Sequence, residues 1–87
     1  MEGNSHNINL IQRKNISISG VKKVENFDDK EFMLNTNMGY LKISGSGLEI
    51  VKLDTDKGDL SIKGKIDSIN YLDSNKNKES IISKLFK

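Results

Sequence analysis

The sequence contains no cysteine, no proline and no tryptophan, and aromatic residues make up only 6% of it. Without cysteine the chain has neither a disulfide framework nor a thiolate metal site, which is typical of a reducing compartment. No apolar stretch approaches the roughly 20 residues that a membrane-spanning helix needs. The polar residues 1–6 do not have the pattern of a signal peptide. These absences predict a cytoplasmic location.

Residue sets for catalysis and metal binding are also missing. The only histidine, His6, lies in the polar amino-terminal segment, where a Ser-His-Asp arrangement has no rigid support. The acidic stretch 54–59 does not match an EF-hand, because Gly58, Asp59 and Lys65 occupy its fifth, sixth and twelfth positions. This stretch predicts a β-turn instead. We expect no catalytic residues, no cofactor and no metal.

The net charge of +2 is weaker than the basic surface of a dedicated nucleic-acid-binding protein. Small β-barrels of the OB type nevertheless bind single strands through basic residues and stacked aromatic rings. Phe32 and Tyr40 are the candidate stacking residues, although alternation places Phe32 in the core. A single-stranded nucleic-acid-binding protein is therefore the alternative function. Six basic residues are candidates for its surface: Arg13, Lys14, Lys22, Lys23, Lys63 and Lys65.

Three short runs, 15–20, 40–45 and 59–64, share a pattern in which apolar residues alternate with polar ones and a glycine closes the run. This period is typical of a strand with one buried face. Eleven isoleucines carry much of the apolar content, and their stiff, β-branched side chains favour strands.

Short strands at intervals of about ten residues predict an all-β fold. We expect a small antiparallel β-sandwich that consists of a meander of six to eight short strands. A short C-terminal helix is one predicted form of the tail, and a barrel is the alternative topology of the strands. The predicted parts are a flexible segment (1–7), the β-sandwich domain (8–73) and a tail (74–87). With 34% hydrophobic residues in 87, the core is thin, so a homo-oligomer is one predicted state.

Departures from strict alternation predict where strands are irregular. The segment 21–27 has no clean apolar face, which indicates an edge strand or a twisted one. Apolar residues on both faces predict a bulge near 50–51. The odd step from Ile66 to Ile69 predicts a second bulge near 67–68.

Clusters of small and acidic residues predict the turns. In 27–31, aspartate side chains are expected to accept hydrogen bonds from nearby backbone amides. The stretch 37–39 predicts a hairpin connection, with Gly39 as the left-handed residue. The run 44–47 predicts another tight link, between two separate strands.

Nearly the whole chain also carries a set of short motifs in a characteristic order, although none of them is diagnostic alone. The motifs are Gly20 to Asp28, Glu31-Phe32, Met38 to Ile43 with Gly45, Leu48, Leu53-Asp54, Lys57-Gly58, Ser61 to Ile66, Tyr71-Leu72 and Ser83 to Lys87. In order and spacing they resemble the YabP family of bacterial sporulation proteins, over about residues 8–87. The related YqfC branch shares the glycine pattern.

This resemblance implies a non-enzymatic protein of endospore-forming bacteria (Firmicutes) that is made during sporulation and needed for proper spore formation. It implies a compact β-sandwich without catalytic residues, in the mother cell or at the surface of the developing spore. Our main hypothesis is a structural or interaction module in spore assembly, whose partners are other spore proteins or a second copy.

Two regions are candidates for these contacts. One is the expected edge strand 21–27. The other is the apolar stripe of 81–86, which would contact an anionic membrane surface or a partner groove, or would pack on its own sheet. The candidate interaction residues are Val21, Lys23, Val24, Tyr40, Ile81, Ile82, Leu85 and Phe86.

Overall fold

The computed structural model describes residues 5–72, which form six antiparallel strands in one continuous sheet. The strands are β1 (Ile8–Ile11), β2 (Asn15–Ile18), β3 (Val21–Phe27), β4 (Glu31–Thr36), β5 (Gly39–Asp54) and β6 (Asp59–Leu72). Their order in the sheet is β1-β2-β6-β5-β4-β3. Because residues 5–72 contain no helix, the all-β prediction is confirmed, and this part offers no membrane-spanning helix. The predicted tail helix lies outside the described residues.

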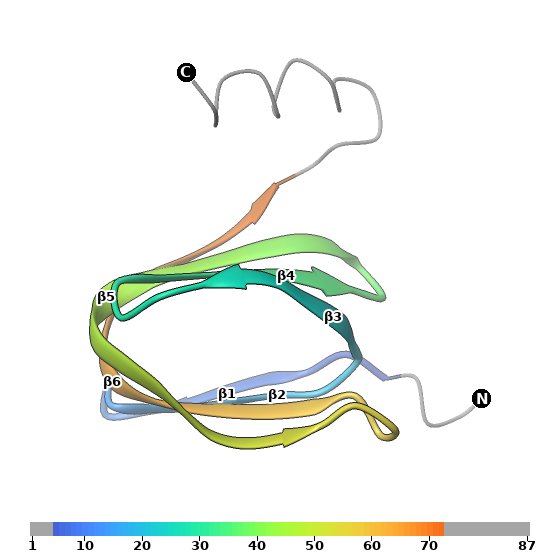
Figure 1. Cartoon of the computed structure of the whole chain (residues 1–87), viewed down its shortest axis with the longest axis horizontal. Helices are drawn as coiled ribbons and strands as arrows, with labels where there is room; N and C mark the ends of the chain where they lie inside the picture. Colours follow the sequence, from blue (N-terminus) through green and yellow to red (C-terminus); the bar gives the residue numbers. More distant parts are fainter. Residues whose placement is uncertain (1–4, 73–87) are drawn as a thin grey trace.

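Strands β5 and β6, with 16 and 14 residues, are much longer than the others, and both bend near their middles. The bends fold the sheet over itself into two layers (Figure 1). The upper layer contains β3, β4, the first part of β5 and the last part of β6. The lower layer contains β1, β2 and the remaining parts of the two long strands. The layers are therefore joined through β5 and β6.

A close approach of two backbones explains the glycine at the bend of β5. A Cβ atom at Gly45 would overlap the carbonyl oxygen of Lys65, so no larger residue fits without a backbone shift. The pairing with β6 continues on both sides of this bend, with register shifts after Ser44 and before Glu49. The prediction that 44–47 links two separate strands is therefore wrong, because these residues lie inside β5.

The core lies between the two layers and is built from alternate residues of the strands. In the lower layer Ile16 pairs with Ile62, which pairs in turn with Ile50, so the three share one face. Full burial of such a side chain stabilises the fold by about 1.5–3 kcal/mol. The buried apolar residues are Ile16, Ile18, Val21, Phe32, Leu34, Leu41, Ile43, Leu48, Leu60, Ile62 and Ile66.

One hairpin pairs with each long strand: β3–β4 pairs with β5 through β4, and β1–β2 pairs with β6 through β2. The turn of each hairpin is hydrogen-bonded to the bend of the long strand with which that hairpin pairs. In the β3–β4 turn, the carbonyl oxygens of Asp29 and Lys30 accept hydrogen bonds from the bend of β5, both at 2.9 Å. In the β1–β2 turn, the carbonyl oxygens of Arg13 and Lys14 accept hydrogen bonds from the bend of β6, at 2.9 and 3.0 Å. The two halves of the fold therefore repeat one arrangement.

The predicted irregularities occur where the sequence indicated them. The pairing of β5 with β6 skips Val51 and Asp67, so both predicted bulges are confirmed. Strand β3 lies at the edge of the sheet and has two register shifts. Gly39 has a positive φ of 117° at the predicted hairpin. The Asp28 carboxylate accepts hydrogen bonds from the backbone amides of Lys30 and Glu31, at 2.8 and 2.9 Å.

Candidate interaction surfaces

Two strand edges face each other along one side of the molecule, and we call this side the front rim. It consists of β3 and residues 49–54 of β5 (Figure 1). Within the described chain, β3 pairs only with β4, and 49–54 pair only with β6. Backbone hydrogen bonds tie the two edges at both ends, from Val21 to Gly58 at 3.0 Å and from Leu48 to Asp29 at 2.9 Å. Between these ties no strand pairing joins them.

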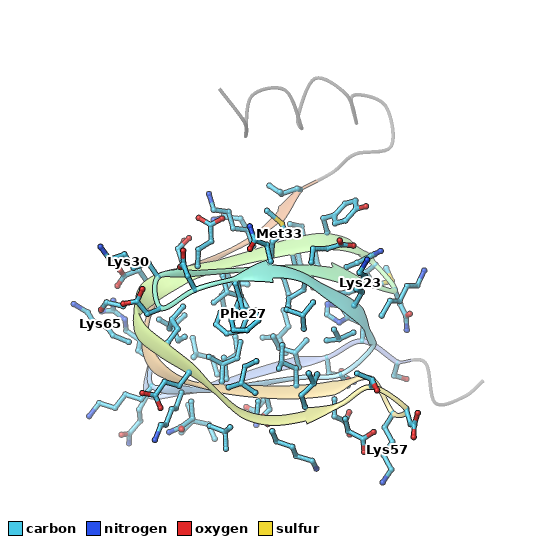
Figure 2. The ribbon with its side chains drawn as sticks, in the orientation of Figure 1. Lys23, Phe27, Lys30, Met33, Lys57 and Lys65 are labelled. Atoms are coloured by element: carbon cyan, nitrogen blue, oxygen red, sulfur yellow. The ribbon has the colours of Figure 1, made fainter. Side chains whose placement is uncertain are left out.

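The front rim carries three large apolar side chains that are exposed. They are Phe27, Val51 and Leu53, with exposed fractions of 55%, 60% and 45%. Figure 2 shows Phe27 between the two layers, at the end of β3. Its ring stacks on the fully buried ring of Phe32, with centroids 5.1 Å apart. The core thus continues outward through Phe27 to a surface that water reaches.

Lysine and glutamate side chains cover the rest of the β3 edge. Lys22, Lys23 and Glu25 are exposed, and the Lys23 ammonium lies 3.9 Å from the Glu25 carboxylate. Charged residues and bulges on an edge strand discourage indiscriminate pairing with other chains. The large apolar side chains that the front rim exposes are therefore Phe27 on β3 and Val51 and Leu53 on β5.

The opposite side, which we call the back rim, consists of β1 and residues 69–72 of β6. Side chains tie this rim near both ends. The guanidinium of Arg13 donates hydrogen bonds to the carbonyl oxygen of Ile66 and the carboxylate of Asp67, both at 2.9 Å. At the other end, the two ring nitrogens of His6 lie 2.7 Å from the carbonyl oxygen of Ser19 and 2.6 Å from the hydroxyl of Tyr71.

The hydrogen bonds of His6 define its tautomer. A carbonyl oxygen only accepts, so Nδ1 carries the proton that is donated to Ser19. In the neutral ring Nε2 then accepts from the Tyr71 hydroxyl. Sequence reasoning missed this role, because Tyr71 lies 65 residues away and no local pattern links the two.

The structure distributes the predicted contact residues over several places. Val21 is buried and Lys23 is exposed, while Val24 and Tyr40 are partly buried. Tyr40 is the second residue of the central strand β5, where it pairs with residues of β4 and β6 and not with the front rim. The four predicted residues of the tail, Ile81, Ile82, Leu85 and Phe86, lie outside the described residues.

Sequence reasoning placed Phe27 in the candidate contact strand 21–27, but it did not select Val51 and Leu53, the apolar residues of the front rim on β5. The available signal was the presence of apolar side chains on both faces of 48–53, which we interpreted only as a bulge or two-sided burial. The bulge at Val51 is real, and Val51 and Leu53 are exposed because no strand covers this edge of β5.

The predicted basic residues separate into two groups. Arg13, Lys14, Lys63 and Lys65 surround one hollow, whereas Lys22 and Lys23 lie on β3. Of the candidate stacking residues, Phe32 is fully buried and Tyr40 is not among the residues that line the hollow. Among residues 5–72 no aromatic side chain lines this hollow, so this part of the chain does not provide the stacking platform of an OB-type single-strand site. Residues 5–72 also contain no group of three or more metal-ligating side chains.

The geometry defines a small all-β domain, one folded six-stranded sheet whose exposed features are strand edges and a basic hollow. Residues 2–78 match the YabP family, so the chain belongs to this family. The chain is also similar to Spore protein YabP of Bacillus subtilis (strain 168), with 47% identity over 49 residues. That match covers 56% of this chain and 49% of the relative, so it spans about half the length of the relative.

Proposed function

We propose that this chain acts in spore formation as a non-enzymatic structural or interaction module. Membership of the YabP family and the similarity to a protein named as a spore protein support the role in sporulation. The expected partners are other spore proteins or a second copy of the chain. The expected location is the mother-cell cytoplasm or the surface of the developing spore, which a fluorescent fusion imaged in sporulating cells would test.

The observation that carries the proposal is the front rim. Two strand edges that pair with no further strand of the described chain lie there beside Phe27, Val51 and Leu53, all of them exposed, and the Phe27 ring stacks on the buried ring of Phe32. Leu10, Ile11, Met38 and Tyr71 are exposed elsewhere in the described residues. Exposed apolar side chains that are grouped at one place typically mark a protein–protein contact. A partner that covers this rim would bury their surface and gain about 25 cal/mol per Å² of apolar area.

The use of the polar side chains supports a non-catalytic role. Both ring nitrogens of His6 are engaged in holding the amino-terminal segment against β2 and β6. The Asp28 carboxylate closes a turn through two backbone amides. These groups hold the backbone, and in doing so they use the hydrogen-bonding capacity that a general acid or base would need.

A complementation experiment tests the role in sporulation. The gene would be deleted in the source organism, and heat-resistant spores would be counted with and without a restored copy. We expect fewer spores in the deletion strain and recovery with the restored copy. Equal spore counts in all strains would reject a role in spore formation.

A pair of variants tests the contact surface. Val51→Lys with Leu53→Lys places two charges on the front rim, whereas Met38→Lys places one at the tip of the β4–β5 hairpin, where Met38 is also exposed. Each variant would first be checked for folding by circular dichroism. We expect the rim variant to reduce spore counts and Met38→Lys to leave them unchanged. Normal spore counts with a folded rim variant would show that this rim is not the contact.

A further inference from the structure

A basic hollow lies beside the β1–β2 turn, on the lower layer near the bend of β6. Its volume is about 600 Å³, within the range of small-ligand sites. Figure 2 shows Lys65 at the end of the molecule where the two long strands bend. The side chains that define the hollow are Gln12, Arg13, Lys14, Asn15, Lys63 and Lys65.

Two of the four cations in this hollow are already paired. Arg13 contacts Asp67 at 2.9 Å, and the Lys63 ammonium lies 3.7 Å from the Glu49 carboxylate. Lys14 and Lys65 have no acidic partner within the described chain. The hollow therefore keeps an excess of positive charge, and two amide side chains beside it provide further hydrogen-bond donors.

The backbone that presents these residues is strained. Gln12 and Arg13 have φ angles of 53° and 59°, in the left-handed region that long side chains rarely adopt. Tight hairpins with this backbone typically use Asn-Gly instead. The strain is held by the hydrogen bond from Lys14 to Ile11 at 2.9 Å and by the attachment of the turn to β6. Strain that the surrounding structure maintains in this way is frequent at binding sites.

We propose that the basic hollow binds a small oxyanion that carries two or more phosphate or carboxylate groups. Lys14 and Lys65 bind its charged groups directly, and Gln12 and Asn15 donate hydrogen bonds. This binding is separate from the contact at the front rim and does not depend on it. None of the described residues that line the hollow is aromatic, which favours a compact anion over a single-stranded nucleic acid, whose bases need stacking.

The acidic β3–β4 turn of a second copy is a weaker candidate for this site. The Asp28 carboxylate is already used by two backbone amides within its own turn. Glu31 is paired with Lys42, at 3.7 Å. Asp29 alone supplies too little charge for a hollow that contains two unpaired lysines.

The test is a titration of the full chain, followed by nuclear magnetic resonance, at one fixed ionic strength. The probes are inorganic tripolyphosphate, citrate and a ten-residue oligothymidylate. We expect saturable shift changes at residues 12–15 and 63–65 with one or both of the small anions, tripolyphosphate reporting a phosphate site and citrate a carboxylate site. The proposal would be overturned if the oligothymidylate bound more tightly than both small anions. It would also be overturned if neither small anion saturated the shift changes below about 10 mM.

Matched variants separate a site from general electrostatic attraction. Lys14→Gln with Lys65→Gln removes two charges from the hollow, and Lys22→Gln with Lys23→Gln removes two from β3. Loss of charge-assisted hydrogen bonds predicts an affinity at least about tenfold lower for the first variant. The second should change the affinity by less than about twofold, since its lysines do not reach the hollow. An equal loss in both would reject a defined site, and the single Lys14→Gln and Lys65→Gln variants replace the double one if it does not fold.

Discussion

The front and back rims are equivalent positions in the folded sheet, but they are held together in different ways. At each rim an outer strand of one layer lies beside an unpaired part of a long strand. Backbone hydrogen bonds, involving Val21 and Leu48, tie the front rim. At the back rim the ties include the side chains of Arg13 and His6. The comparison shows that a sheet edge is restrained by a few contacts at its ends, without a continuous ladder.

The two rims also differ in what they expose. The front rim presents Phe27, Val51 and Leu53, and the back rim presents Leu10, Ile11 and Tyr71, which are 38%, 52% and 50% exposed. The hydroxyl of Tyr71 also forms a hydrogen bond with His6. At the back rim the side chains of His6 and Arg13 bridge the two strand edges, whereas at the front rim the exposed ring of Phe27 stacks on the buried ring of Phe32 and continues the core to the surface. This difference is the physical basis for placing the contact at the front.

The largest expected effect comes from the bend that both rims share. Gly45→Ala would force a Cβ atom into the carbonyl oxygen of Lys65. We therefore expect the free energy of unfolding to fall by more than about 4 kcal/mol, or the variant not to fold. Gly47→Ala is the control, because open space surrounds it and only its φ of 62° is unfavourable, by about 1–2 kcal/mol. Chemical denaturation measures both. Similar losses would show that the bend is not set by the backbone contact.

A second prediction compares the core with the front rim through two stacked rings. Phe32→Ala empties a fully buried site and should cost about 3–5 kcal/mol. Phe27→Ala removes a ring that is 55% exposed and should cost about 1 kcal/mol, mainly from the lost stacking. Urea denaturation of the two variants measures both losses in the free energy of unfolding and so gives their ratio. A loss at Phe27 as large as that at Phe32 would mean that the front rim is part of the core.

A third prediction compares the ties at the two rims. Gly58 and Gly20 have nearly the same φ, 75° and 74°, so alanine strains both backbones equally. At Gly58 the Cβ atom would lie 3.0 Å from the backbone of Val21, within the front tie. At Gly20 it would meet the Cα of His6 and the carbonyl oxygen of Ser5, both at 2.9 Å, in a segment that precedes β1 and belongs to no strand. Gly58→Ala should therefore cost about 2–3 kcal/mol and Gly20→Ala about 1–2 kcal/mol.

Thermal unfolding of the two glycine variants gives the measurement. A larger loss for Gly20→Ala would indicate that the back tie is the more rigid of the two. The comparison would then favour the front rim as the side that opens first.

The smallest expected effect concerns the side-chain tie at the back rim. Tyr71→Phe keeps the ring beside His6 but removes the hydroxyl, so we expect a loss of about 0.5–1 kcal/mol. Hydrogen exchange of the β1 amides should become faster, while exchange in β4 should not change. Unchanged exchange in β1 would show that the hydroxyl does not hold this edge. Tyr40→Phe is the matched control, since Tyr40 is the other tyrosine and pairs in the interior of the sheet.

Alternation predicted the local features of this fold because it depends only on neighbouring residues. Ile16 and Ile18 share the buried face that their spacing indicates, and the bulges near Val51 and Asp67 follow from the change of face. The run 44–47 was misinterpreted for the same reason. Glycine in a strand permits either a turn or a close backbone approach, and only the position of Lys65 shows which one applies.

The candidate surfaces were less accessible to prediction. The sequence indicated that 21–27 is an edge strand, but not that residues 49–54 of β5 lie beside it. It supplied the basic residues, but the grouping of Arg13 and Lys14 with Lys63 and Lys65 required the pairing of β2 with β6. These relations join residues 22 to 52 positions apart, and no local period indicates them.

By itself the sequence determined the secondary-structure class, the inward face of the strands, the bulges and the family, because each is written in the order and spacing of nearby residues. Only the tertiary structure decided that two long strands bend, which edges remain unpaired, and which cations share a hollow. Those properties follow from how distant segments pack against each other, and packing is settled by the whole chain at once.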